Sequence, residues 1–383
     1  MSRLKIALAA AVLLLSVLGS WQFYVVFGSA SWREVFALLG TIPAPVWLQL
    51  AALTALFYLL DWVRFRSVLA VLGHRLRWID GLQLTCVSYF VTSLTPMAEL
   101  HTPAMVLMLQ RLNVPTPQAL AASLTKSIYM TLWICAVSYA CLLFDHSIRL
   151  APALRLALPV LSLPLLAIAV PLALIAFFPQ RVLARTQAWG AALQSRIARG
   201  APAGQPLAGS GVTPARHANQ PASHAHAPVP SPVRWRRACL IALRKLVLGL
   251  GHSAASIAQI GQSGQLQHLI CHLASITFLL VYVTIGWLMA AYFGFSLHFW
   301  QALTIFSTSL MVAYLAPLPG AIGVTEIATA YMLDPALGPQ AMAAALVLRI
   351  LCWYLVGPPG ALVLLHVLRS GTWRWPTLFR DGD

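Results

Sequence analysis

Long apolar segments dominate the pattern of hydrophobic and polar positions along this chain. A segment of about 20 apolar residues is typical of a spanning helix, because each helical residue adds about 1.5 Å toward a hydrocarbon core of about 30 Å. The pattern therefore predicts an all-α polytopic membrane protein with about six full spanning helices. These are expected at 6–27, 45–62, 119–144, 153–178, 266–293 and 340–368, the last with a kink at 357–360.

Two further apolar blocks are interrupted by proline and glycine, which break helices. The first block, 78–112, is broken at Pro96, and the second, 299–333, is broken at Pro317, Pro319, Gly320 and Gly323. The last arm of the second block, 324–333, would reach only about 15 Å as a helix, half of the hydrocarbon core. That arm is therefore predicted to be re-entrant. For the first block, the re-entrant and fully spanning alternatives stay open.

Composition agrees with a membrane protein, since 60% of the residues are hydrophobic, 9% are charged and the mean hydropathy is +0.78. A soluble enzyme and a disordered chain are both excluded by these values. The middle of the chain differs: 179–237 is predicted to be a flexible cytoplasmic linker. The segment 238–265 is predicted to be an interfacial amphipathic segment, with an ordinary solvated connector as the alternative. They separate membrane halves at 1–178 and 266–368, and a cytoplasmic tail follows at 369–383.

The net charge of +16 is an orientation signal. Most of the 25 Lys and Arg residues fall near the N-terminus, between residues 64 and 77, between 181 and 245, or in the tail. The positive-inside rule places these groups in the cytoplasm, provided that each broken block enters and leaves on one side. Both termini are then cytoplasmic, and the expected location is the bacterial inner membrane. Because the bases are juxtamembrane and no aromatic-basic platform accompanies them, nucleic acid is not an expected partner.

The order helix, broken hairpin, helix occurs twice, first over 45–144 and then over 266–368 in the opposite orientation. Inverted repeats with broken helices at mid-membrane are typical of transporters. Residue identities in the two units match poorly, so the repeat is a hypothesis at this point.

A few ionisable residues lie inside apolar segments, where each charge costs at least about 2.5–3.5 kcal/mol. We expect them to line a polar cavity: Glu99, His101, Lys126, Glu326 and Arg349. The alternative is structural, since both carboxylates sit at helix starts, where they would complement free N–H groups and pair with a nearby cation. Asp61 is near a predicted helix end, and we expect it to be interfacial. The linker residues His217, His224 and His226 lack Cys or carboxylate partners, so no metal site is predicted.

The second hairpin carries a recognisable motif, Pro317-Leu-Pro319-Gly320-Ala-Ile-Gly323-Val-Thr-Glu326. It resembles the P-x-P-G-G-x-G-x-x-E signature of the lysylphosphatidylglycerol synthase transmembrane-region family, a flippase-like domain. The helix around Arg349 that ends in Gly-Pro-Pro-Gly is similar to the last helix of that family. The first hairpin resembles the P-x-x-G-E segment of the family, but Ala98 stands where Gly is usual and Thr102 where Arg is common.

The resemblance implies a stand-alone member without the acyltransferase domain, and therefore a transporter rather than an enzyme. The leading hypothesis is a flippase that moves a phospholipid or lipid-linked sugar between leaflets, without a cofactor. One alternative is a non-transporting accessory subunit of a hopanoid or glycolipid biosynthesis complex, with the biosynthetic enzymes as partners. The other is an intramembrane enzyme, although the sequence has no H-E-x-x-H or G-x-S-x-G motif. A Walker A motif is also missing, so ATP hydrolysis by this chain is not expected.

Overall fold

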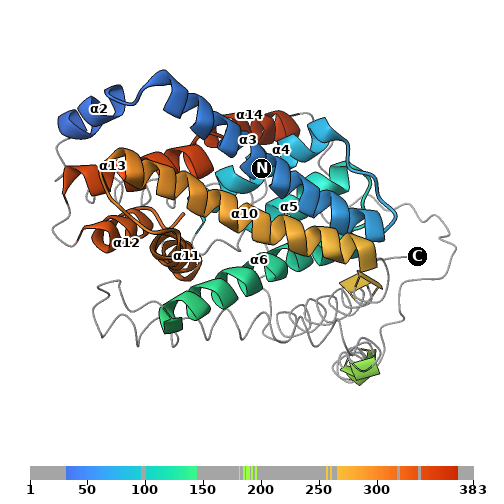
Figure 1. Cartoon of the computed structure of the whole chain (residues 1–383). Helices are drawn as coiled ribbons and strands as arrows, with labels where there is room; N and C mark the ends of the chain where they lie inside the picture. The colour runs from blue at the N-terminus through green and yellow to red at the C-terminus, as the bar shows by residue number, and fades with distance from the viewer. Residues whose placement is uncertain are drawn as a thin grey trace, which may run out of the picture.

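The computed structural model describes residues 32–95, 101–144, 265–316, 320–334 and 338–369, with scattered helical positions between 181 and 195 and between 256 and 260. The predicted helices 6–27 and 153–178, most of the linker with its three histidines, and the tail beyond 369 lie outside the described residues. Within the described part every regular element is a helix (Figure 1). The prediction of an all-α polytopic membrane protein is confirmed.

Two units of helices make up the described fold. The first contains α3 (Ala44–Val71), α4 (Trp78–Leu94), α5 (Thr102–Arg111) and α6 (Thr116–Phe144). The second contains α10 (Gln265–Tyr292), α11 (Phe299–Leu315), α12 (Val324–Leu333) and α13 (Pro339–Arg349), which continues through the π-helical η2 (Ile350–Tyr354) into α14 (Gly357–Arg369). Four stretches are long and apolar enough to cross a membrane: α3, α6, α10 and 339–367. A short helix that was not predicted, α2 (Trp32–Gly40), packs on α13.

Two predicted boundaries are wrong. Helix α3 continues to Val71 instead of ending at residue 62, so Arg64 and Arg66 lie on a helix and not in a cytoplasmic loop. The break in the last helix lies at η2, before the predicted kink, because the prolines that follow occupy the first turn of α14. Proline is tolerated in a first turn, where the backbone N–H has no partner within the helix.

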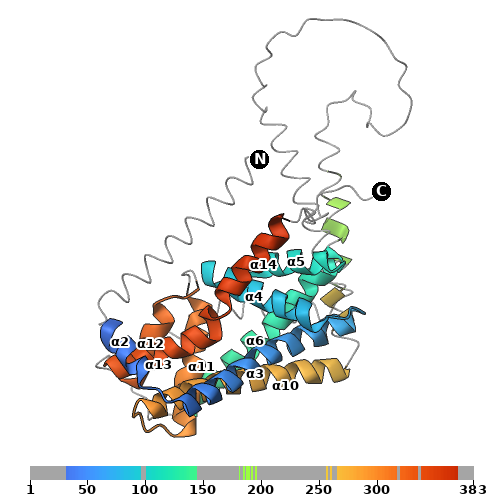
Figure 2. The same cartoon turned by 90° about the horizontal axis from the view of Figure 1, so that it is seen from above.

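The two units repeat the same helix lengths. Helices α3 and α10 each have 28 residues, α4 and α11 each have 17, and α5 and α12 each have 10. A single shift of 221 residues carries α3 onto α10 and α4 onto α11, for example from Ala44 to Gln265. Helices α3 and α10 lie side by side and run in opposite directions (Figures 1 and 2). After the hairpins the shift is 222, and 117–124 then matches 339–346 with six identical residues in eight.

Packing follows the same repeat. Phe57 and Phe278, which the 221-residue shift makes equivalent, stack on each other with ring centroids 4.1 Å apart where α3 meets α10. Helix α6 packs on α11, and in the equivalent place α14 and η2 pack on α4; likewise α5 packs on α6 and α12 on α13. The inverted repeat is therefore present in element order, helix length and contacts. Residue identities match closely only at 117–124 and 339–346, and elsewhere the two units match poorly, as the sequence indicated.

Both broken blocks have the geometry of re-entrant hairpins. Helices α5 and α12 have 10 residues each, about 15 Å of helix, which is too short for a hydrocarbon core of about 30 Å. The hairpins approach from opposite ends of the helices and meet at their breaks, where the Gly320 amide donates to the Thr95 carbonyl at 3.0 Å. The length of α5 favours the re-entrant alternative for the first block.

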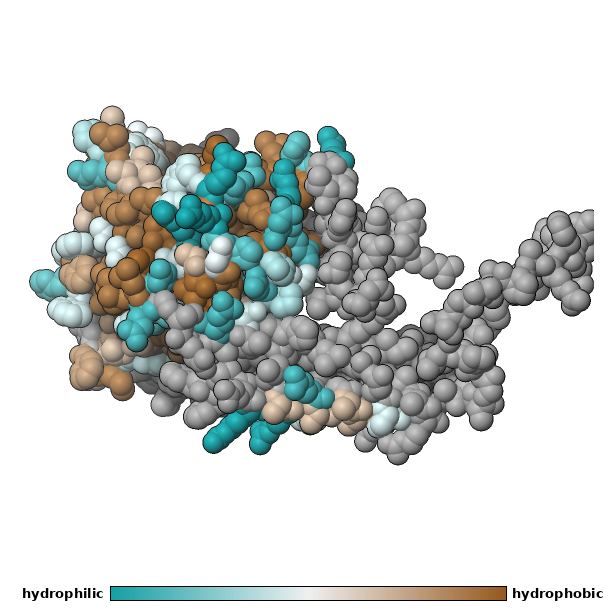
Figure 3. Space-filling view, turned by 90° about the vertical axis from the view of Figure 1, so that its right-hand side faces the viewer, coloured by the Kyte–Doolittle hydropathy of each residue, from teal (hydrophilic) through white to brown (hydrophobic). Residues whose placement is uncertain are grey.

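Exposed bases gather at one end of the described helices, where α3 ends and α4 begins. They are Arg66, Arg75, Arg77 and Arg111. Figure 3 looks onto this end and shows hydrophilic groups between hydrophobic ones. The connection 293–298 at the other end contains no Lys or Arg. Large apolar side chains are exposed along the helices themselves, among them Leu48, Leu266 and Leu362. A surface of this kind is suited to acyl chains.

Candidate functional site

Three charged side chains meet inside the helix bundle. The Asp61 carboxylate accepts from Arg64 Nη1 at 3.0 Å and from Lys126 Nζ at 2.8 Å. The three residues are only 1%, 2% and 6% exposed, respectively. Asp61 and Arg64 are three residues apart on one face of α3, and Lys126 reaches them from α6. We call this set the charged triad.

Further contacts hold the triad in place. Arg64 Nε donates to the Ser275 hydroxyl of α10 at 3.0 Å, and Arg64 Nη2 donates to the Lys126 carbonyl at 3.1 Å. Its guanidinium lies 5.0 Å from the Phe278 ring centroid, and Lys126 Nζ lies 4.1 Å from that of Phe65. Cation–π contacts of this kind favour a cation at a desolvated site. The triad thus links α3, α6 and α10.

The triad corrects two predictions. Asp61 is buried and lies well before the end of α3 at Val71 instead of near a helix end, and Arg64 belongs to the site instead of a loop. Lys126 pairs with Asp61, whereas Glu99, the carboxylate predicted for this hairpin, lies outside the described residues. A signal was present in the sequence: an acid and a base at spacing i, i+3 neutralise each other on one helix face, so the apolar segment can continue past them.

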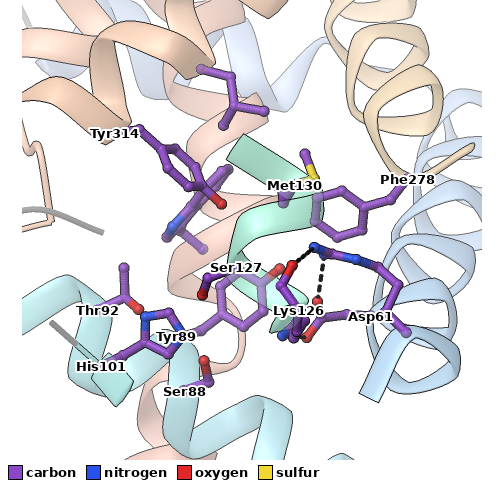
Figure 4. Close-up of a pocket in the computed structure, with 13 residues that line it drawn as sticks. Asp61, Ser88, Tyr89, Thr92, His101, Lys126, Ser127, Met130, Phe278 and Tyr314 are labelled. Atoms are coloured by element: carbon purple, nitrogen blue, oxygen red, sulfur yellow. Dashed lines mark hydrogen bonds and ion pairs between the residues drawn. The ribbon is translucent and has the colours of Figure 1, made fainter. Parts of the chain in front are cut away.

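The triad borders a small cavity of about 50 Å³ (Figure 4). Helix α4 contributes polar side chains to its wall, Ser88, Tyr89 and Thr92, and the predicted site residue His101 joins them at the start of α5. The opposite wall comes from the second unit and includes Phe278, Leu310, Tyr314 and Trp353. Both units therefore shape the cavity, close to the place where the two hairpins meet.

A second charged cluster lies at the second hairpin. Arg349 Nε is 3.3 Å from Glu326 Oε1, and the two residues are 3% and 1% exposed. The same carboxylate accepts from the Tyr354 hydroxyl at 3.0 Å and from the Gly323 amide at 2.8 Å, at the start of α12. The structural role weighed for Glu326, helix capping and charge pairing, is therefore present. Arg349 also donates to the Gly320 carbonyl.

The predicted site residues fall into two groups. Lys126 and His101 line the cavity, while Glu326 and Arg349 do not. Trp353 lies between the groups, because its ring lines the cavity and lies 4.5 Å from the Arg349 guanidinium. Among the predicted hairpin breaks, Gly320 and Gly323 take left-handed φ angles of 58° and 85°, which glycine adopts readily. Pro96, Pro317 and Pro319 lie outside the described residues.

The fold and the buried charges together define a class: a helical membrane protein with an inverted repeat, two re-entrant hairpins that meet, and a polar cavity beside them. The chain belongs to the lysylphosphatidylglycerol synthase transmembrane-region family, whose model matches residues 4–360. A membrane location and a lipid-related role follow from that membership. Searches of curated proteins and of solved structures give no significant match.

Proposed function

We propose that this protein moves a lipid with an anionic head group between the leaflets of the bacterial inner membrane. The charged triad beside the cavity is the observation that carries the proposal. Ions buried inside a membrane domain are costly, and those that face a cavity usually mark a substrate path. Lys126 and Arg64 offer N–H donors suited to a phosphodiester, and the hydroxyls of Ser88, Tyr89 and Thr92 add neutral donors.

The inverted repeat supports transport over an accessory or enzymatic role. In transporters of this architecture the substrate site lies at the interface of the repeats near mid-membrane, next to broken helices. The cavity here has the same relation to the two hairpins, and side chains of both units line it. The proposal assigns no chemical reaction to the chain.

The described residues leave little space at the site. A cavity of about 50 Å³ has room for a few water molecules at about 10–15 Å³ each, whereas sites for small ligands measure about 300–1,000 Å³. On this proposal the described form is closed, and a head group enters after the hairpins move apart. On this account the transport cycle alternates between the closed form and forms that open toward one leaflet or the other.

A reconstitution experiment tests the proposal. Proteoliposomes that contain fluorescent phosphatidylglycerol in both leaflets are treated from outside with dithionite, which bleaches only the outer label. If the protein moves the lipid, bleaching continues beyond the plateau of protein-free vesicles. A plateau equal to that of protein-free vesicles, from correctly folded protein, would refute the proposal for this lipid class. Fluorescent phosphatidylcholine serves as the matched lipid, and its slower movement would support selection of an anionic head group.

A further inference from the structure

We infer that Arg349 is a positioning residue that does not touch the transported head group. It holds together the two hairpin tips, by which we mean Thr95 at the end of α4 and Gly320 before α12. The inference deepens the proposed function and rests on it only where opening of the tips is called a transport step. Its basis is a chain of contacts from Arg349 through Gly320 to Thr95.

Gly320 is held from two sides. Its carbonyl accepts from Arg349 Nη2, and its amide donates to the Thr95 carbonyl at 3.0 Å. The first contact ties the tip of the second hairpin to α13, and the second ties that tip to the end of α4. Arg349 thereby stabilises Gly320, the residue through which, among the described positions, the second hairpin is hydrogen-bonded to the backbone of the first.

The approach of the two tips depends on glycine. Gly320 has a φ of 58°, and a Cβ atom there would lie 2.9 Å from both the Cα and the carbonyl oxygen of Ser93. The backbone of Gly320 therefore packs directly on the backbone of Ser93, with no side chain of residue 320 between them. A small separation of the tips would therefore break the Gly320–Thr95 hydrogen bond completely.

The lock adjoins the cavity. Thr92 and Tyr314, near the ends of α4 and α11, line the cavity within a few residues of the tips. Trp353 completes the connection, since it contacts the cavity on one side and Arg349 on the other. Separation of the tips would move two walls of the cavity apart, which is the change that a head group requires for entry.

Glu326 makes the lock rigid. It pairs with Arg349 Nε, accepts from Tyr354, and caps the start of α12 through the Gly323 amide. Arg349 is thus oriented by α12 and η2 while its Nη2 atom holds Gly320. A lysine has one nitrogen where arginine has a planar fork of donors, so Arg349→Lys cannot occupy both the Glu326 and Gly320 positions at once.

Thiol accessibility at the tip tests the lock without any lipid transport. Thr95→Cys keeps the backbone carbonyl that accepts from Gly320 and places a thiol at the tip. The five native cysteines in the described part are buried, and labelling of the protein without the Thr95→Cys change measures the background. The test variant is Arg349→Met with Glu326→Gln, which removes both charges together and keeps an oxygen to accept from the Gly323 amide. The control is Arg66→Met, which removes a cation that lies outside both the lock and the cavity lining.

The double variant should raise the rate at which a water-soluble maleimide labels residue 95 by about tenfold, the factor that corresponds to about 1.4 kcal/mol. The control should label like the parent. Unchanged labelling in the double variant, or an equal rise in the control, would overturn the inference. If the double variant fails to fold, Arg349→Lys carries the test: its labelling should also rise, and parental labelling would be contrary to a lock. Because labelling needs no lipid movement, its outcome is separate from that of the dithionite assay.

Discussion

Asp61→Asn removes the only carboxylate that the described residues place between Arg64 and Lys126. Both carboxylate oxygens accept charge-assisted hydrogen bonds, at 3.0 and 2.8 Å, and the residue is 1% exposed. Two such bonds at about 1.5–3 kcal/mol each give about 3–6 kcal/mol. This agrees with the cost of about 3–5 kcal/mol for removing one partner of a buried ion pair. We therefore expect the free energy of unfolding to fall by about 4 kcal/mol.

Unfolding in mixed detergent micelles, followed by tryptophan fluorescence, measures this change. Asp80→Asn is the control, because Asp80 lies in the first turn of α4 outside the triad, where a loss below about 1 kcal/mol is expected. Adding Lys126→Met to Asp61→Asn should recover about 2 kcal/mol, since one of the two buried cations is then gone. Equal stabilities for Asp61→Asn and Asp80→Asn would refute the claim that the carboxylate neutralises the triad.

Three further substitutions test two packing contacts and one buried hydrogen bond. Gly360→Ala should lower the unfolding free energy by about 1–3 kcal/mol in the same assay, because the new methyl would overlap an α4 carbonyl. Gly357→Ala is the control: its methyl would enter open space, so the unfolding free energy should fall by less. Phe57→Ala should cost about 3–5 kcal/mol through loss of the ring stacked on Phe278, and a cost near zero would contradict the packing of α3 on α10. Tyr354→Phe should cost about 1.5–3 kcal/mol, since it removes a hydrogen bond to a buried carboxylate, and unchanged stability would remove that bond from the account.

Most of the described fold was predictable because lipid imposes a simple rule on sequence. Apolar runs placed the second broken block at 299–333 and its last arm at 324–333, and in the structure α11 begins at residue 299 and α12 occupies 324–333. The end of α3 was not predictable from hydropathy alone, since Asp61, Arg64 and Arg66 lower the average over its last turns. Asp61 and Arg64 can be buried because they pair with each other and with Lys126 of α6 and Ser275 of α10, which are distant in the sequence, whereas Arg66 is exposed.

The candidate site was predictable in part. Lys126 and Arg349 stood out as single cations in apolar helices, and both are buried in ion pairs. Their partners and roles depend on tertiary contacts, however. Pro117–Leu124 and Pro339–Leu346 give equivalent starts to α6 and α13, yet Lys126 follows its proline by nine residues and Arg349 follows its own by ten. One residue rotates a helix by about 100°, which helps to direct one side chain to the cavity and the other to the hairpin tip.

The central claim is that lipid passes through the cavity beside the charged triad, and lipid movement in a Lys126→Met variant tests it most directly. In the dithionite assay with phosphatidylglycerol, Lys126→Met should slow movement by about tenfold or more, because it removes a charged donor from the cavity wall. The control is Arg66→Gln, which removes an exposed base from the same end of the bundle and should move lipid like the parent. Folded Lys126→Met protein that moves the lipid at the parental rate would contradict the account.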